Sequence, residues 1–307
     1  MGETVNLNRN LLLAIFFCSI LTAAFARDHQ VQRPKITGVA EIDLRTDNLA
    51  ASKHFYADEM GFPVQDTGAN SLRFRVNDQQ YISIMKAANP TEPRLVSIAF
   101  ITTDAEALRA YLAANDMRVP TKVEKNADGD RSFEVIDPED HRVRFVQYGK
   151  QHSGKAAQDK SQEVGKHMIH VGFIVHDQAA EDRFYKDLLG FRSYWHGGMK
   201  DNKTDWVSIQ VPDGTDWLEY MLNIGPDASH RTIGVMDHMA IGVTNINAAF
   251  DRVKANGWSG DSKPQLGRDG KWQLNLYDPD DTRIEAMEFK PKEEPCCSPY
   301  MAQHPGE

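Results

Sequence analysis

The stretch FYADEMGF at residues 55–62 returns in the second half of the chain as FYKDLLGF at residues 184–191. A second motif repeats in the same order, because DPED at residues 137–140 is matched by DPDD at residues 278–281. The separations are 129 and 141 residues, and similarity of this kind in the same order is the signature of a duplicated architecture. The sequence therefore predicts two copies of one structural unit.

Each half divides again into two modules. Four strand-like runs end in an Asp or Asn that can cap a following helix: Val39 to Asp47, Ser97 to Asp104, His170 to Asp177 and His238 to Asn245. Amphipathic stretches follow, such as Ala180 to Leu189, which Gly190 can end. Alternating strand patterns come next, for example residues 206–211 and 217–222. The predicted fold is α+β, with a βαβββ module that occurs four times.

The first 26 residues have the features of an export signal. Arg9 precedes an apolar stretch from Leu11 to Leu21, and residues 24–26 read AFA, a small-residue cleavage signal. The apolar stretch is shorter than the roughly 20 residues of a membrane-spanning helix. We expect cleavage before Arg27 and an exported protein, periplasmic or secreted, with no membrane segment afterwards. An uncleaved membrane anchor is the alternative.

The rest of the chain is long enough for two domains. Residues 150–166 are polar and aperiodic, which is typical of a linker. The predicted divisions are a leader at residues 1–26, a first domain at 35–149, a linker at 150–166, a second domain at 167–290 and a tail at 291–307. The net charge of −9 argues against a nucleic-acid partner and favours small molecules or other proteins. The chain could act as a monomer or a homodimer.

Two cysteines, Cys296 and Cys297, adjoin each other in the predicted tail. They could form a disulfide with each other, join two chains or bind a soft metal in an oxidising compartment. They could equally lie in a mobile tail without a fixed role.

Two imidazoles and two carboxylates stand in apolar runs of the second half: His170, Glu219, His238 and Glu285. A buried group of this kind costs several kcal/mol unless it is paired or binds a metal, on the order of the desolvation penalties of polar groups. Two neutral imidazoles and two carboxylates neutralise a divalent ion and leave one or two coordination positions open. The sequence predicts one divalent metal ion here, which could be nickel, zinc, iron(II), manganese or cobalt.

Small residues lie on the same strand face as each histidine, because side chains alternate along a strand. His170 shares its face with Gly172, and His238 shares its face with Ala240 and Gly242. We expect these small residues to leave room for a ligand.

The four modules, the FYxDxxGF helix motif and the DPD turn before a strand that bears Glu285 resemble the vicinal oxygen chelate superfamily over about residues 35–290. The resemblance implies that paired modules form two cup-shaped half-barrels, with metal ligands on the first and last strands of a module. It assigns His170 and Glu219 to the third module, and His238 and Glu285 to the fourth. The corresponding positions of the first half are Ala40, Ser83, Ser97 and Arg144. We therefore expect the first cup to be free of metal.

The two-His, two-Glu set resembles that of bacterial-type glyoxalase I, in which a metal-bound Glu moves a proton between adjacent carbons while the metal stabilises an enediolate. Glu285 or Glu219 would be this base, which predicts a lyase or isomerase acting on a small oxygenated substrate. One alternative is an iron-dependent extradiol ring-cleaving dioxygenase, for which His196 and Tyr277 are the nearest second-sphere candidates. Another is a binding protein that sequesters a small molecule, as the resistance proteins of this superfamily do.

All five tryptophans fall in the second half of the chain. Trp217 lies two residues before Glu219 and shares its strand face, so it is the best candidate for a wall of the substrate pocket. Tryptophans are more often core residues, which is the alternative explanation. His196 and Tyr277 complete the predicted pocket.

Overall fold

The computed structural model describes residues 1–2, 32–90, 92–150, 152 and 162–307. The predicted leader and most of the predicted linker lie outside the described residues, so export and cleavage stay predictions. Residues Arg33 to Glu307 form one compact unit. No helix in the described part of the chain is long and apolar enough to cross a membrane.

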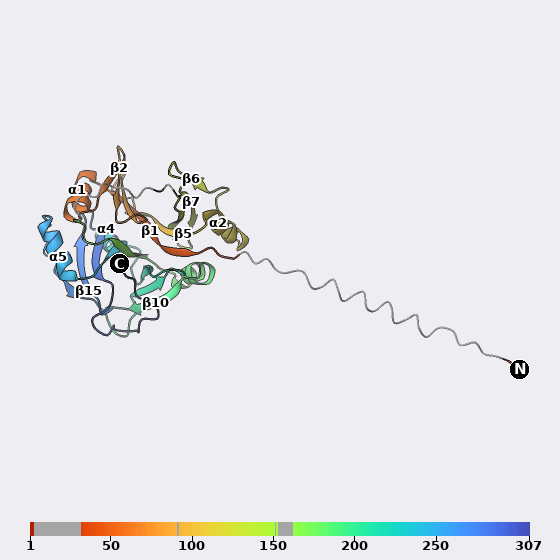
Figure 1. Ribbon diagram of the computed structural model, residues 1–307. Coiled ribbons are helices and arrows are strands. Elements are labelled where there is room, and N and C mark those ends of the chain that lie inside the picture. The colour runs from red at the N-terminus through yellow and green to blue at the C-terminus, as the bar shows by residue number, and fades with distance from the viewer. Residues whose placement is uncertain (3–31, 91, 151, 153–161) are drawn as a thin grey trace. The chain divides into compact units, whose positions relative to one another are not determined.

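Four βαβββ modules follow one another, as predicted (Figure 1). The first contains β1 (Ile36–Thr46), α1 (Leu49–Lys53), η1 (His54–Glu59), β2 (Val64–Gly68), β3 (Ser71–Arg75) and β4 (Tyr81–Lys86). The second contains β5 (Leu95–Thr102), α2 (Ala105–Ala114), β6 (Glu124–Lys125), β7 (Arg131–Ile136) and β8 (Arg142–Gln147). The third contains β9 (His167–Ile174), α3 (Gln178–Asp182), η2 (Arg183–Leu188), β10 (Arg192–Gly197), β11 (Trp206–Gln210) and β12 (Trp217–Met221). After an additional helix, α4 (His230–Met236), the fourth contains β13 (His238–Val243), α5 (Ile246–Ala255), β14 (Gln265–Leu266), β15 (Trp272–Tyr277) and β16 (Arg283–Glu288).

Modules pair into two curled eight-stranded sheets, which confirms the two predicted cups. Their strand orders are β2-β3-β4-β1-β5-β8-β7-β6 and β10-β11-β12-β9-β13-β16-β15-β14. In each sheet the first strands of the two modules pair antiparallel, and each pairs in parallel with the last strand of its own module. The first and last strands of the two modules, where the metal ligands were predicted, therefore lie side by side at the centre of each sheet.

Helix starts follow the predicted caps in three modules. The side chains of Asp104, Asp177 and Asn245 each accept a hydrogen bond from the backbone N–H three residues later, at 2.9–3.0 Å. In the first module Asn48, and not the expected Asp47, caps the helix by accepting from Ala51 N at 3.1 Å. The Asp47 carboxylate instead forms an ion pair with Arg94.

The FYxDxxGF motif forms the wide π-helical turns η1 and η2. Met60 N donates to Phe55 O at 2.9 Å, and Leu189 N donates to Phe184 O at 3.0 Å. This spacing of five residues turns both aromatic residues of the motif, such as Phe184 and Tyr185, into the core. The glycine that follows has a positive φ in each copy, which explains why glycine ends both segments.

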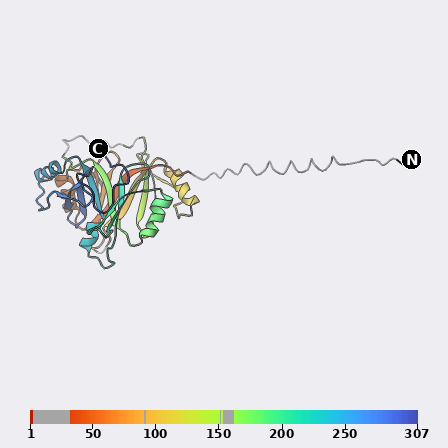
Figure 2. The ribbon, with the colours of Figure 1, turned by 90° about the horizontal axis from the view of Figure 1, so that it is seen from below.

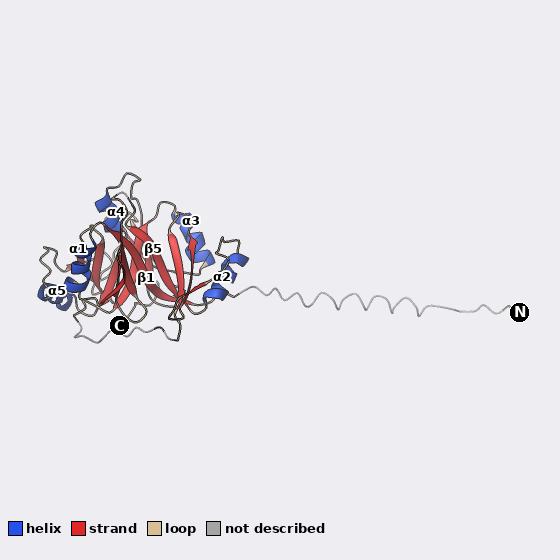
Figure 3. Ribbon diagram, turned by 90° about the horizontal axis from the view of Figure 1, so that it is seen from above, coloured by secondary structure: helices blue, strands red, loops and turns tan. Residues whose placement is uncertain are grey.

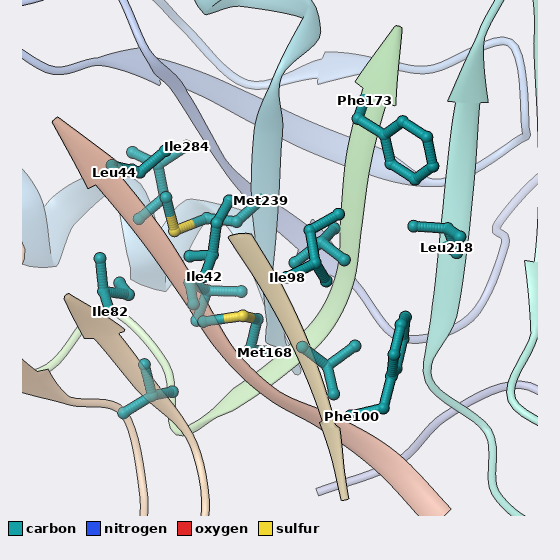
Figure 4. Packing of buried hydrophobic residues seen from close by; sticks show 14 of the residues in the cluster. Ile42, Leu44, Ile82, Ile98, Phe100, Met168, Phe173, Leu218, Met239 and Ile284 are labelled. Atoms are coloured by element: carbon teal, nitrogen blue, oxygen red, sulfur yellow. The ribbon is translucent and has the colours of Figure 1, made fainter. Parts of the chain in front are cut away.

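One hydrophobic core serves both halves of the chain. The faces of the two sheets that point away from the cups contribute to a single cluster, which includes Ile42 and Phe100 of the first half and Met168 and Phe173 of the second (Figure 4). The helices cover the flanks of the sheets (Figure 3). The large residues that alternate with His170 and His238 thus pack in this core.

Helices from different halves lie side by side. In Figures 1 and 2, α1 is next to α5 and α2 is next to α3. Asn256 Nδ2 donates to Glu59 O at 3.0 Å at the first junction, and Tyr111 Oη donates to Leu188 O at 2.8 Å at the second. The duplicated halves therefore meet at two similar junctions.

The tail from Pro291 onward contains no helix or strand among its described residues, but it packs against the second cup. Met301 N donates to Tyr194 O at 2.9 Å, and the hydroxyl of Tyr300 donates to Asp269 O at 2.9 Å. Cys296 and Cys297 form a disulfide with each other. Of the alternatives that the sequence left open, the structure contains the intramolecular disulfide in a packed tail.

Candidate metal centre

The structure brings the four predicted ligands together in the second cup. His170 lies on β9, Glu219 on β12, His238 on β13 and Glu285 on β16. The Nε2 atoms of the two histidines are 3.1 Å apart. Glu219 Oε2 is 3.4 Å from His238 Nε2, and Glu285 Oε2 is 3.7 Å from His170 Nε2. Four potential donor atoms thus converge on one point from four neighbouring strands.

Both imidazoles are neutral. The rings of His170 and His238 are fully buried. Burial lowers the pKa of His170 well below its ordinary value, and burial together with the charge of Arg283 lowers the pKa of His238 to about 3. Neutral imidazole is the form that binds a metal ion.

Hydrogen bonding fixes the orientation of His238. Its Nδ1 lies 2.7 Å from Met236 O, so Nδ1 carries the proton and Nε2 presents a lone pair to the centre. His170 Nδ1 is buried and has no hydrogen-bond partner among the residues that the structure describes. The two facing imidazole nitrogens and the two carboxylates present lone pairs to the same point. A divalent cation can bind all of these lone pairs.

The two carboxylates are held differently. Glu219 Oε1 accepts a hydrogen bond from Ser208 Oγ at 3.1 Å. Glu285 Oε1 forms an ion pair with Arg283 Nη1 at 2.7 Å. The closest mutual group is His170, Glu219 and His238, whose ligand atoms lie within 4.8 Å of one another. Glu219 therefore lies near both histidines, as the predicted ligand set requires.

Gly172 makes room for a ligand side chain. A Cβ atom at this position would lie 2.1 Å from His238 Cε1. The small residue beside His170 thus accommodates the neighbouring imidazole ring, because Gly172 pairs with His238 across β9 and β13.

A cavity of about 300 Å³ opens onto the centre. Glu219 and Glu285 line it, and its wall includes Trp217 as predicted. Trp195, Trp206, Tyr194 and Tyr300 make it largely aromatic, with Met199, Leu266 and Met287, and its polar residues include Arg268, Gln273, Asn275 and Arg283. Trp217 Nε1 and Asn275 Oδ1 are buried and have no hydrogen-bond partner within the described ranges. The cavity suits a small, flat ligand with polar edges.

Two residues of the predicted pocket lie elsewhere. The backbone N–H of His196 donates to Ser298 Oγ at 3.0 Å, and its side chain is not part of the cavity wall. Tyr277 is at the far end of β15 and 36% exposed, whereas Gln273 and Asn275 of the same strand line the cavity. Neither residue lines the cavity as predicted, because His196 follows Trp195, whose side chain does, and Tyr277 lies beyond Gln273 and Asn275 on β15.

Lys271 was missed by the sequence reasoning. It is fully buried behind the cavity wall, where its Nζ donates to Tyr194 Oη at 3.2 Å and lies 4.4 Å from the centre of the Trp217 ring. Burial lowers the pKa of this lysine to about 8. The Tyr194 hydroxyl is also 2.7 Å from Nδ1 of His304, in the tail. Because Lys271 falls in a polar turn of the sequence, no pattern indicated its burial.

The first cup has an ion-pair cluster in place of the ligand set. Asp43 pairs with Ser97 across β1 and β5 as Gly172 pairs with His238 across β9 and β13. This register aligns His170 with Glu41, and not with the predicted Ala40. The prediction of Ala40 was wrong by one residue, because the separation of 129 residues between the two FYxDxxGF motifs carries His170 to Glu41.

Arg144, at the position of Glu285, closes this cluster. Its Nη2 lies 2.8 Å from Glu41 Oε2 and 3.2 Å from Asp43 Oδ2. Ser83 donates to Glu41 and Ser97 donates to Asp43. The guanidinium of Arg144 therefore occupies, in the first cup, the place at which the four predicted metal ligands meet in the second cup.

Comparisons with known proteins agree with this architecture. A model for the Glyoxalase/Bleomycin resistance protein/Dioxygenase superfamily matches residues 38–145 and 167–286. No curated protein matches the chain.

Solved structures of similar fold include two dioxygenases and a glyoxalase. The 2,3-dioxygenase LapB from Pseudomonas sp. KL28 has a TM-score of 0.66 at 14% identity and covers 86% of this chain and 97% of its own. The Mn(II)-bound glyoxalase from Novosphingobium aromaticivorans has a TM-score of 0.63 at 19% identity and covers 83% of both chains. Homoprotocatechuate 2,3-dioxygenase from Arthrobacter globiformis has a TM-score of 0.62 at 20% identity and covers 83% of this chain and 80% of its own. At these identities the likeness shows the fold alone.

Proposed function

Because the chain belongs to the glyoxalase/bleomycin resistance protein/dioxygenase superfamily, we propose that its second cup is a metal-dependent lyase or isomerase acting on a small oxygenated substrate. The observation that carries this proposal is the convergence of two neutral imidazoles and two glutamates on one point. Four protein ligands leave two adjacent positions of an octahedron for two substrate oxygens. A divalent ion bound there would stabilise negative charge that develops on these oxygens.

Glu219 is the better candidate for the base that moves a proton between adjacent substrate carbons. Its side chain is 14% exposed and lines the cavity, and Ser208 orients one of its oxygens. Glu285 is the weaker candidate, because its Oε1 is held in an ion pair with Arg283 at 2.7 Å. The Glu285 carboxylate would instead contribute negative charge to the metal site.

The cavity wall orients the substrate and excludes water. Trp195, Trp206 and Trp217 would contact a flat substrate, and the partnerless Trp217 Nε1 and Asn275 Oδ1 would bind its polar edge. Because the aromatic wall lowers the local dielectric constant, the electrostatic interaction between the metal site and the reacting substrate would be stronger than in water.

A ring-cleaving dioxygenase is the second candidate, favoured by the tight group of His170, Glu219 and His238. If Arg283 keeps Glu285 away from the metal, two histidines and one carboxylate leave three positions open, as non-haem iron oxygenases require. Dioxygenases and a glyoxalase are both among the structural neighbours. The two functions differ in whether Glu285 is a ligand.

Elemental analysis of purified protein tests the centre. We expect one divalent ion per chain in the wild type, its loss in His170→Ala and His238→Ala, and its retention in His196→Ala, a histidine of the same cup outside the cavity. Metal content unchanged by both ligand substitutions would refute the assignment.

Solvent deuterium exchange distinguishes the reactions. A lyase or isomerase should introduce deuterium at the carbon next to a substrate carbonyl without oxygen uptake, and Glu219→Gln should abolish this while keeping the metal. Oxygen consumption with catechols, together with metal retention in Glu285→Gln, would favour the dioxygenase instead.

A further inference from the structure

A second cluster of ligand-type side chains lies at the junction of the second and third modules, outside both cups. Asp137 and His141 flank the turn between β7 and β8, and Glu181 lies on α3. One ligand atom from each lies within 4.8 Å of the others. The side chain of Asp137 and the whole of Glu181 are inaccessible to solvent.

One oxygen of this buried cluster lacks a partner. Glu181 Oε1 accepts a hydrogen bond from Glu139 N at 3.1 Å, but Glu181 Oε2 has no hydrogen-bond partner among the described residues. His141 Nδ1 lies 3.0 Å from Asp137 Oδ2, which also accepts from the Tyr185 hydroxyl at 3.2 Å. The buried carboxylate that carries this partnerless oxygen therefore belongs to a cluster with an imidazole and a second carboxylate.

The cluster carries more negative charge than its own residues neutralise. A third buried carboxylate, Asp237, acts on His141 electrostatically. Even with a protonated imidazole, three carboxylates leave an excess of two negative charges. Uncompensated buried charges are strongly destabilising. A proton on Glu181 would remove only one of these two charges, whereas a divalent cation would balance both.

The equivalent junction of the first and fourth modules forms without these charges. There the Tyr56 hydroxyl donates to Asp278 Oδ2 at 3.0 Å, as Tyr185 does to Asp137. Thr282 N donates to Asp278 Oδ1 at 2.8 Å, as His141 N does to Asp137. Thr282 thus takes the place of His141, and the small Ser52 takes the place of Glu181 on the helix. The junction does not need an imidazole or a second carboxylate to fold.

We propose that Asp137, His141 and Glu181 bind a divalent cation that links the turn of the first cup to helix α3 of the second. Two carboxylates and one imidazole suit Zn²⁺ or Mn²⁺. The site is separate from the catalytic centre and does not depend on the proposed function. Its role is structural, because its ligands are buried in the junction of the two halves.

Metal titration in a variant that lacks the catalytic ligands tests the site. In His170→Ala/His238→Ala protein stripped with chelator, we expect equilibrium dialysis against Zn²⁺ and against Mn²⁺ to restore one equivalent of at least one of the two metals. Adding Glu181→Gln should remove that equivalent. Failure to bind either metal, or binding that is unchanged by Glu181→Gln, would overturn the proposal.

Thermal unfolding supplies an independent readout and a matched control. The metal should raise the melting temperature of His170→Ala/His238→Ala protein by several degrees, as expected when a ligand binds only the native state. The rise should vanish with Glu181→Gln and persist with Asp278→Asn, which changes the equivalent aspartate of the other junction. A parent protein whose melting temperature rises with neither metal, together with a Glu181→Gln variant that is more stable than this parent, would overturn the proposal and show that a proton neutralises Glu181.

Discussion

Replacing Lys271 with methionine should stabilise the protein near pH 7. Lys271 is fully buried, and no carboxylate within ion-pair distance of its Nζ is found in the described part of the chain. Burial lowers its pKa from 10.5 to about 8. Because one pKa unit corresponds to about 1.4 kcal/mol, keeping the ammonium charged costs the folded state about 3 kcal/mol below pH 8.

The expected gain is smaller than this cost, because Lys271→Met also removes the hydrogen bond to Tyr194 Oη, worth about 1 kcal/mol. We expect a net increase of about 2 kcal/mol in the free energy of unfolding at pH 7, and a melting temperature higher by roughly 5 °C. Methionine fills a similar volume and keeps the contact with the ring of Trp217.

The pH dependence identifies the cause. A group with a depressed folded-state pKa is deprotonated in the folded state before it is in the unfolded state, so wild-type stability should rise between about pH 8 and pH 10.5 relative to the variant. Urea unfolding at pH 7, 8 and 9 measures this difference, which should shrink as pH increases. A variant less stable than the wild type at pH 7, or a difference independent of pH, would refute the reasoning.

Three further substitutions probe other features. Gly172→Ala should weaken metal binding at least tenfold in a metal titration, because the new Cβ would lie 2.1 Å from His238 Cε1. Gly225→Ala is its control, because a Cβ at that position would have no neighbour within 4 Å among the described residues. Arg144→Met should cost about 1–3 kcal/mol in urea unfolding at pH 8, because it removes the ion pair of Asp43, whereas Glu41 keeps its pair with Arg73. The loss should be smaller at pH 5, since burial and the charge of Glu41 raise the pKa of Asp43 to about 6 and its carboxylate is then protonated. Tyr300→Ala should free the tail from Asp269 and accelerate proteolysis after Pro291, whereas Tyr300→Phe, which keeps the ring, should change the cleavage rate less.

Local patterns predicted the repeat and the fold. Strand alternation and the duplicated FYxDxxGF motif were sufficient for the four modules, because each module is built from contacts that are close in sequence. The four candidate ligands could also be found, since charged groups in apolar strand runs need a compensating partner. The wide π turns could not be distinguished from an ordinary helix, because both place Phe184 and Leu189 on a buried side.

Features that depend on contacts between distant segments were not predictable. The ion-pair cluster of the first cup depends on contacts of Arg144 on β8 with Glu41 and Asp43 on β1, which no local pattern indicates. Lys271 is buried by Tyr194, Trp217 and Tyr300, which come from β10, β12 and the tail. The same is true of Glu181, whose burial depends on a turn of the other half.

The common core of the two halves separates two kinds of constraint within the first cup. Residues such as Ile42 and Phe100 support the strands that carry the second cup, so mutational scanning should find them intolerant of change even though they lie far from the metal centre. The inner face of the same strands, with its ion-pair cluster, should accept coordinated exchanges that keep charge balance. The inner face of the first cup can therefore change its binding chemistry during evolution, while the core face is conserved because it supports the second cup.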